Sequence, residues 1–415
     1  MKQYVIIGNG IAAASCIEGI RSIDTEVKIT VISEENHPVY CRPLISYYLE
    51  GKTDSEHMNY RSSDFYDKMD CQVIYGKKAE KIDSSAKRII LDDGTLIPYT
   101  STCIATGSSS FIPEFEGIET VENKFSFMTM DDTLALESVV NKNSKVLIIG
   151  AGLIGLKCAE GLKNRVAKIT VCDLADRVLS SILDKECADI MQTHLEANGI
   201  EFILDDTVQN FDKNIATMKS GKTVEFDVLV LAVGVRANIE LIKDIGGNFN
   251  RGIIIDTKMQ TSIEGIYAAG DCTESVDISS GEKKVLALLP NANMQGKCAG
   301  VNMAGGNETF EKAIPMNSIG FFGMHAMTAG SYYTEAEGGE VFEVKCGDSL
   351  KRLFTKEGYL TGFIIIGNTE RAGIYTSLII ERTPLETVDF EMLKLHATSM
   401  AFSPEIRRNK FGGVV

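Results

Sequence analysis

The start of the chain holds the pattern that most constrains its fold: a strand, a glycine-rich turn, a helix and a second strand. The apolar run at residues 4–7 leads into the turn Gly8-Asn9-Gly10-Ile11-Ala12-Ala13, and a helical stretch of small residues follows. A second apolar run, residues 27–32, ends at Ser33-Glu34-Glu35. Short runs rich in β-branched residues are typical of buried parallel strands. The order therefore predicts a βαβ unit that binds a dinucleotide.

Each position of this turn has a physical reason to be there. Gly8 permits the tight turn, and Gly10 lets a pyrophosphate approach the backbone because it carries no Cβ. Ala13 lets the helix pack closely on the strand. The helix N-terminus directs N–H groups and the positive end of its dipole at the phosphates. An acid after the second strand can bind the ribose hydroxyls, and we expect Glu34 to do this, with Glu35 as the alternative.

The same pattern occurs a second time. Residues 146–149 lead into Gly150-Ala151-Gly152-Leu153-Ile154-Gly155, and the next strand, residues 167–172, ends at Asp173. Two copies predict two bound dinucleotides. Asp173 can bond both ribose hydroxyls of NADH and would repel a 2′-phosphate, so NADH is favoured over NADPH. Arg177, four residues further on, could weaken that preference.

Composition fits a soluble, cytoplasmic enzyme. A chain of 415 residues predicts two or three domains. No apolar stretch is long enough to span a membrane, and no export leader precedes the first strand. The net charge of −15 argues against nucleic acid and anionic membrane surfaces as partners. The ten cysteines include no C-x-x-C pair, which argues against a disulfide framework, an iron–sulfur cluster or a structural metal site.

The remaining segments predict an α/β chain with a small final domain. Residues 71–75 and 87–91, with the turn Asp92-Asp93-Gly94, predict a small antiparallel sheet. Residues 102–108 predict a strand end followed by a glycine turn, residues 228–235 predict a buried strand with a glycine end, and residues 184–198 predict a helix. Strands near residues 318–323, 340–344, 350–354 and 360–367, followed by a helix, predict a C-terminal α+β domain.

These motifs resemble the two-dinucleotide-fold flavoproteins of the pyridine nucleotide-disulfide oxidoreductase superfamily. The chain looks most like NADH:rubredoxin and ferredoxin reductases and the flavin-binding N-terminal part of NADH nitrite reductase. The resemblance implies two nested Rossmann-like three-layer domains and a small C-terminal α+β domain. Residues 1–112 and 247–312 would bind FAD, residues 113–246 would bind NAD(P)H, and residues 313–415 would form an interface or dimerisation domain.

The resemblance also implies which residues hold the cofactors. Asp271, at a Gly-Asp strand end, would contact the FAD ribityl chain, although any such acid can instead cap a turn. Residues implied to bind FAD are Gly8, Gly10, Ala12, Ala13, Glu34, Glu35, Arg42, Pro43, Ala79, Ala105, Thr106, Gly107, Gly270, Asp271 and Gln295. Residues implied to bind NAD are Gly150, Gly152, Leu153, Ile154, Gly155, Asp173 and Gly234.

Several positions depart from the family pattern. Lys157 stands where relatives often have a Glu near the nicotinamide, and Ala237 stands where they have a Pro. The paired redox cysteines of the disulfide-reducing members are absent. Cys41 lies about two residues early for the single redox cysteine of the peroxidase and CoA-disulfide reductase branches. His396 resembles the acid–base His of dithiol-using relatives, but without the Pro and Glu that follow it there.

The sequence therefore predicts an FAD-dependent oxidoreductase that takes hydride from NADH and passes electrons to an external iron–sulfur protein. The acceptor would be a rubredoxin, a ferredoxin or a partner subunit, and the enzyme a monomer or homodimer. Two alternatives stay open: an NADH oxidase or peroxidase, with Cys41 or without it, and a low-turnover redox sensor or assembly subunit. No catalytic side chain is certain, with Lys157 and Cys41 as candidates. Arg407, Arg408 and Lys410 form a candidate docking patch for an acidic partner.

Overall fold

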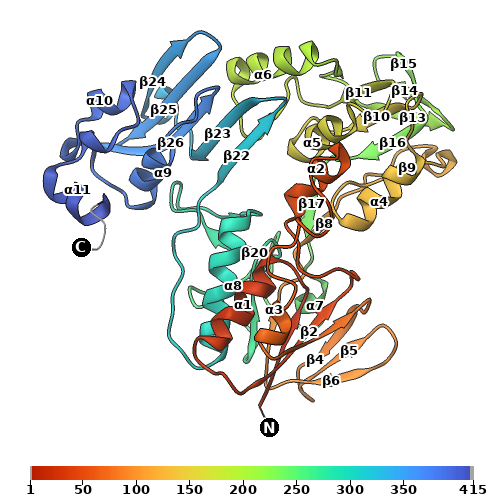
Figure 1. Ribbon diagram of the computed structural model, residues 1–415, viewed down its shortest axis with the longest axis vertical. Helices are drawn as coiled ribbons and strands as arrows, with labels where there is room; N and C mark the ends of the chain where they lie inside the picture. Colours follow the sequence, from red (N-terminus) through yellow and green to blue (C-terminus); the bar gives the residue numbers. More distant parts are fainter. Residues whose placement is uncertain (1, 412–415) are drawn as a thin grey trace. The chain divides into compact units, whose positions relative to one another are not determined.

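The computed structural model describes residues 2–411, which form two compact units. The first unit contains the residues up to Leu174 together with Ile200–Val276 and Lys283–Ala313. The second contains Ala175–Gly199, Asp277–Glu282 and the residues from Ile314 onward. Figure 1 shows the elements of both units in sequence colours.

The first unit is built on two parallel sheets of five strands, which confirms the α/β class predicted from the sequence. The first sheet has the order β19-β7-β1-β2-β3. Its strands are β1 (Gln3–Ile7), β2 (Lys28–Ser33), β3 (Cys71–Tyr75), β7 (Ser101–Ile104) and β19 (Ile266–Ala268). The second sheet has the order β12-β11-β10-β16-β9. Its strands are β9 (Lys124–Phe125), β10 (Lys145–Ile149), β11 (Lys168–Cys172), β12 (Glu201–Ile203) and β16 (Val228–Leu231).

Helices connect and cover these sheets. α1 (Ile11–Arg21) follows β1, and α5 (Leu153–Leu162) follows β10, as the two fingerprints predict. α1 packs closely against α8 (Leu289–Met303), because a Cβ on Gly296 would lie only 2.1 Å from the carbonyl oxygen of Ala12. The other helices of this unit are α2 (Ile45–Glu50), α3 (Phe65–Lys68), α4 (Met130–Val139) and α7 (Glu240–Lys243).

Smaller sheets complete the first unit. They comprise β4 (Ala79–Asp83), β5 (Arg88–Leu91) and β6 (Leu96–Pro98); β13 (Val208–Asp212), β14 (Ile215–Met218) and β15 (Thr223–Glu225); β18 (Ile253–Ile254), β20 (Thr273–Val276) and β21 (Lys283–Val285); and the ribbon of β8 (Ser108–Ser110) and β17 (Val235–Ala237). The prediction that residues 71–75 join the small antiparallel sheet is wrong. Strand β3 instead pairs in parallel with β2 at the edge of the first sheet. The long segment between β2 and β3 allows the crossover that a parallel pair requires.

The second unit contains an antiparallel sheet of five strands in the order β22-β23-β26-β25-β24. Its strands are β22 (Met316–Phe321), β23 (Met324–Gly330), β24 (Gly339–Cys346), β25 (Ser349–Lys356) and β26 (Tyr359–Ile366). Its helices are α6 (Lys185–Ala197), α9 (Gly373–Ile380), α10 (Phe390–Leu395) and α11 (Pro404–Phe411). The four predicted strands are present, but β23 was not predicted. Phe363 and Tyr375 are fully buried where α9 covers the sheet.

Candidate functional site

The two glycine turns have the same geometry. Gly8 has φ +108°, and a Cβ built on it would lie 2.2 Å from the carbonyl oxygen of Ala105. Gly150 has φ +113°, and its Cβ would lie 2.2 Å from the carbonyl oxygen of Ala232. Positive φ together with so close a backbone neighbour restricts both positions to glycine. Each sheet therefore presents the same tight turn before its helix.

The second glycine of each turn faces open space instead. Gly10 and Gly152 are the N-caps of α1 and α5, with φ −93° and −82°, and a Cβ on either would meet nothing within 4 Å. No side chain caps either helix, so the first N–H groups of α1 and α5 keep their capacity to bind an anion. These cradles fit the pyrophosphates of two dinucleotides.

The third positions differ between the turns. A Cβ on Gly155 would lie 2.0 Å from the carbonyl oxygen of Gly150, so this glycine allows α5 to pack against its own turn. Ala13 at the corresponding place in α1 is fully buried. The Cβ of its neighbour Ala12 lies 3.0 Å from the position that a Cβ on Gly270 would occupy. The first glycine turn and the Gly270–Asp271 turn are thus brought together. Leu153 and Ile154 form the first residues of α5.

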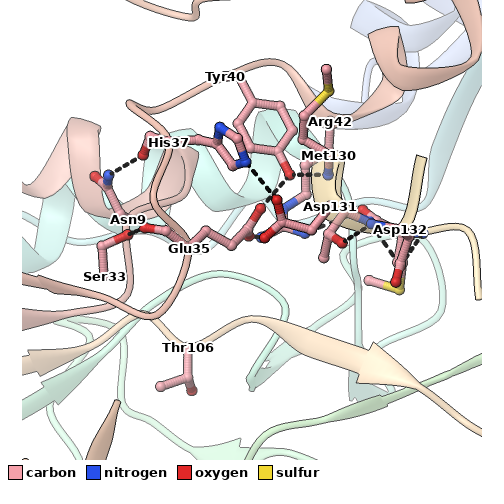
Figure 2. Close-up of polar contacts among 12 residues, drawn as sticks. Asn9, Ser33, Glu35, His37, Tyr40, Arg42, Thr106, Met130, Asp131 and Asp132 are labelled. Atoms are coloured by element: carbon pink, nitrogen blue, oxygen red, sulfur yellow. Dashed lines mark hydrogen bonds and ion pairs between the residues drawn. The ribbon is translucent and has the colours of Figure 1, made fainter. Parts of the chain in front are cut away.

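The two acids after β2 have different surroundings. Glu35 accepts a hydrogen bond from the hydroxyl of Tyr40 at 2.7 Å and is paired with Arg42, so its carboxylate is already engaged (Figure 2). Glu34 is 68% exposed and has a loose contact of 3.3 Å with Lys78. Glu34 is therefore the more accessible of the two acids, and its binding to a ribose stays a prediction.

The segment after β2 is anchored to the start of α4. The backbone N–H of Met130 donates to the Tyr40 hydroxyl at 2.9 Å, and Arg42 donates to the carbonyl of Met128 at 3.2 Å. His37 contacts Asp131 at 2.7 Å (Figure 2). The segment is thus a structured part of the unit, and Pro43 lies in the 3₁₀ turn Arg42–Leu44 that precedes α2.

Asp271 lies in the turn after β19 at the carboxyl end of the first sheet. Burial raises the pKa of Asp271 to about 6, although the positive charge of Arg42 acts in the opposite direction. The side chain of Gln295, on α8, holds this turn: its oxygen accepts from the N–H of Gly270 at 2.7 Å, and its nitrogen donates to Ser275 at 2.6 Å. Gln295 therefore positions the turn that carries Asp271.

Asn238 directly follows Ala237, which departs from the family pattern, and the sequence interpretation gave Asn238 no role in the site. Its side-chain nitrogen donates to the carbonyl of Thr106 at 2.8 Å, and its backbone carbonyl accepts from the Thr106 hydroxyl at 3.1 Å. Its backbone N–H donates to the carbonyl of Gly107 at 3.0 Å. Asn238 thus fixes the loop at residues 105–107. The adjacent Ser108 hydroxyl is buried and has no hydrogen-bond partner among the described residues, which is consistent with a ligand that completes this loop.

The remaining predicted residues are placed as follows. Asp173 accepts a hydrogen bond from the N–H of Ala151 at 2.6 Å, which fixes its carboxylate beside the second turn. Gly234, with φ +122°, meets no atom within 4 Å at its Cβ position, and Ala79 is a buried residue of β4. Within the second unit, Arg177 pairs with Asp176 at 2.7 Å.

Cys41 and His396 are the two residues that the sequence compares with redox or acid–base groups of relatives. Cys41 is half-buried, and burial raises the pKa of its thiol, which disfavours the reactive thiolate. His396 is an exposed residue after α10.

The candidate docking patch near the end of the chain is only partly described. Arg408 is exposed and Arg407 is partly buried, whereas the side chain of Lys410 lies outside the described residues. No described group of three or more His, Cys, Asp or Glu side chains could hold a metal ion.

Comparison with known proteins gives consistent matches. The sequence pattern of the pyridine nucleotide-disulphide oxidoreductase family matches residues 2–296. The chain is 32% identical to the NADH-dependent phenylglyoxylate dehydrogenase subunit epsilon of Aromatoleum evansii, over 92% of each chain. It is 30% identical to the assimilatory nitrate reductase electron transfer subunit of Bacillus subtilis (strain 168), over 92% of this chain and 50% of that relative, so it spans half of that protein.

Two further matches extend over most of both proteins. The chain is 30% identical to an NADH oxidase of Methanocaldococcus jannaschii, over 97% of this chain and 96% of that relative. The solved structure of a NAD-dependent persulfide reductase from A. fulgidus superposes with a TM-score of 0.86 at 25% identity, covering 97% of this chain and 80% of that one. The resemblance inferred from the two glycine turns is thereby confirmed. Among the described helices, none is long and apolar enough to cross a membrane.

Proposed function

Because the chain belongs to the pyridine nucleotide-disulphide oxidoreductase family, we propose that it is an FAD-dependent NADH reductase that passes electrons to a separate iron–sulfur protein. The family is one of NAD(P)H-dependent flavin oxidoreductases. We further propose that residues 1–112 and 247–312 hold FAD, and that residues 113–246 hold NADH. The observation that carries the proposal is the pair of matching turns, in which Gly10 and Gly152 both face open space.

The roles of the chain's own residues follow from this geometry. The N-termini of α1 and α5 would each bind a pyrophosphate, and Glu34 and Asp173 would bind the two sets of ribose hydroxyls. Asp271 and Arg42 would hold the part of FAD between its ring and its phosphates. When bound, FAD supplies the chemistry of accepting a hydride equivalent and releasing its two electrons singly.

An external acceptor is supported by what the chain lacks. Family members that reduce disulfides carry paired redox cysteines, whereas all ten cysteines here are free and none is in a C-x-x-C pair. Two relatives bear names that describe subunits: a subunit epsilon of an NADH-dependent dehydrogenase and an electron transfer subunit of an assimilatory nitrate reductase. Both names fit a flavoprotein that serves another polypeptide.

The decisive experiment is anaerobic reduction of the FAD-loaded protein by NADH, followed by rapid mixing with candidate acceptors. We expect reoxidation by a rubredoxin or a ferredoxin to be at least tenfold faster than reoxidation by O2 or H2O2, since proximity and docking accelerate transfer to a specific partner. Faster reoxidation by O2 or peroxide would favour the second candidate, an NADH oxidase, which the Methanocaldococcus jannaschii relative supports. Failure of NADH to reduce the flavin would contradict both.

The variant Cys41→Ser tests whether a cysteine takes part. Because burial raises the pKa of the Cys41 thiol, we expect the variant to match the wild type in flavin reduction and in reoxidation by every acceptor. Cys346, which is exposed, gives a matched control as Cys346→Ser. Loss of peroxide-driven reoxidation in Cys41→Ser alone would contradict this expectation and assign a redox role to Cys41.

A further inference from the structure

The helices α2 and α5 meet in a close-packed seam between the two dinucleotide folds. α2 follows the turn that carries Arg42, and α5 begins at the second glycine turn. Figure 1 shows them side by side. A Cβ on Gly161 of α5 would lie 2.9 Å from the carbonyl oxygen of Ser46 on α2, and Arg165 donates to the carbonyl of Leu49. The seam therefore joins the element that follows one nucleotide site to the element that begins at the other.

A buried ion pair lies on this seam. The ammonium of Lys157 is paired with the carboxylate of Glu160 one turn further along α5, and these side chains are only 16% and 8% exposed. The same ammonium lies 4.8 Å from the centre of the Tyr47 ring on α2. The carboxylate of Glu160 and the face of the Tyr47 ring together hold the Lys157 ammonium in place.

Lys157 is the first charged residue of α5. It lies four residues after Leu153, which is about 6 Å along the helix axis from the phosphate-binding end. Hydride transfer requires the two reacting rings to be in contact, so the nicotinamide must reach a place where the two folds meet. The nicotinamide ring is neutral in NADH and positively charged in NAD+. A cation at the seam therefore repels the oxidised nucleotide and not the reduced one.

We propose that Lys157, held by Glu160 and Tyr47, makes the site discriminate between NADH and NAD+ and so promotes release of the oxidised product. This inference rests on the proposed use of NADH and is independent of the acceptor. The carboxylate of Glu160 partly neutralises the ammonium, so the discrimination is moderate, of about tenfold, as for one partly screened charge pair.

The test is equilibrium binding of NAD+ and of the non-reactive analogue tetrahydro-NADH to the FAD-loaded protein. In Lys157→Met we expect NAD+ to bind about tenfold more tightly, with the analogue changed by less than about threefold, because only the oxidised ring carries charge. Lys157→Arg should keep the wild-type ratio of the two affinities. Glu160→Gln, which removes the neutralising carboxylate, should weaken NAD+ binding instead.

The matched control is Lys52→Met. Its ammonium lies 5.8 Å from the same Tyr47 ring but is 57% exposed and paired with Glu50, so neither affinity should change. If the ratio of the NAD+ and analogue affinities were the same in Lys157→Met as in the wild type, the proposal would be overturned. A melting curve of the variant separates this result from misfolding. Failure of the wild type to reduce an iron–sulfur protein would contradict the proposed function while leaving this ratio interpretable.

Discussion

Replacing Gly10 by alanine is expected to give a folded chain that loses FAD but still binds NADH, and Gly152→Ala is expected to do the opposite. The added methyl group meets no protein atom in either case, and the φ angles of −93° and −82° suit alanine. Each methyl group would occupy the place where a pyrophosphate approaches the helix N-terminus. Loss of two charge-assisted hydrogen bonds would weaken the binding of the affected nucleotide by roughly 100-fold or more.

The flavin retained after purification and the dissociation constant for NADH are the two measurements. Gly373→Ala is the control, because its Cβ also meets nothing within 4 Å and Gly373 lies in α9 of the second unit. It should change neither quantity, and all three variants, freed of flavin, should melt like the flavin-free wild type. If Gly10→Ala lost NADH binding and retained FAD, the proposed assignment of FAD to the first fold and NADH to the second would be reversed.

The sequence alone predicts these turns because their determinants are local. Gly8, Gly10, Gly150 and Gly152 stand at short, matching spacings directly after continuous apolar runs that mark the flanking strands, so the pattern can be seen within a few residues. Strand β23 was missed because its small residues, such as Ala326 and Ala329, lack the β-branched runs that mark the other strands of its sheet. Only its pairing with β22 and β26 makes it a strand.

The polar contacts of the site were not predictable, because their partners are far apart in the sequence. Nothing near Asn238 indicates that it fixes the loop at Thr106. The choice between Glu34 and Glu35 depends on Tyr40 and Arg42, which take up Glu35 only in the folded chain. Lys157 could be recognised as unusual from its position, but its pairing with Glu160 and its contact with Tyr47 required the structure.

Asp271 shows a conflict between stability and binding that can be measured. Burial raises its pKa from 3.8 to about 6. A folded state with the higher pKa binds more protons than the unfolded chain between these values, so stability falls as the pH rises through this window. The raised pKa of Asp271 corresponds to a penalty of roughly 3 kcal/mol well above pH 6. Below about pH 3.8 Asp271 is protonated in both the folded and the unfolded state and carries no such penalty, and near pH 4 most of the penalty is already absent.

In the flavin-free protein, Asp271→Asn is therefore expected to raise the melting temperature by a few degrees at pH 8 and to leave it unchanged near pH 4. Asp93→Asn is the control of opposite sign. Its carboxylate pairs with Lys77 at 2.7 Å, which lowers the pKa of Asp93, so this substitution should lower the melting temperature at pH 8. A melting temperature of Asp271→Asn that follows the wild type at every pH would show that Asp271 is not destabilising.

The same substitution should weaken FAD binding. An ionised carboxylate makes stronger hydrogen bonds to hydroxyl groups than an amide does, and losing about 1.5–3 kcal/mol corresponds to roughly 10- to 100-fold in affinity. Titration of the flavin-free protein with FAD at pH 8 measures this loss. A more stable protein that binds FAD less tightly is the signature of a residue retained for its ligand. If Asp271→Asn were instead less stable and bound FAD as tightly as the wild type, Asp271 would serve only the turn after β19.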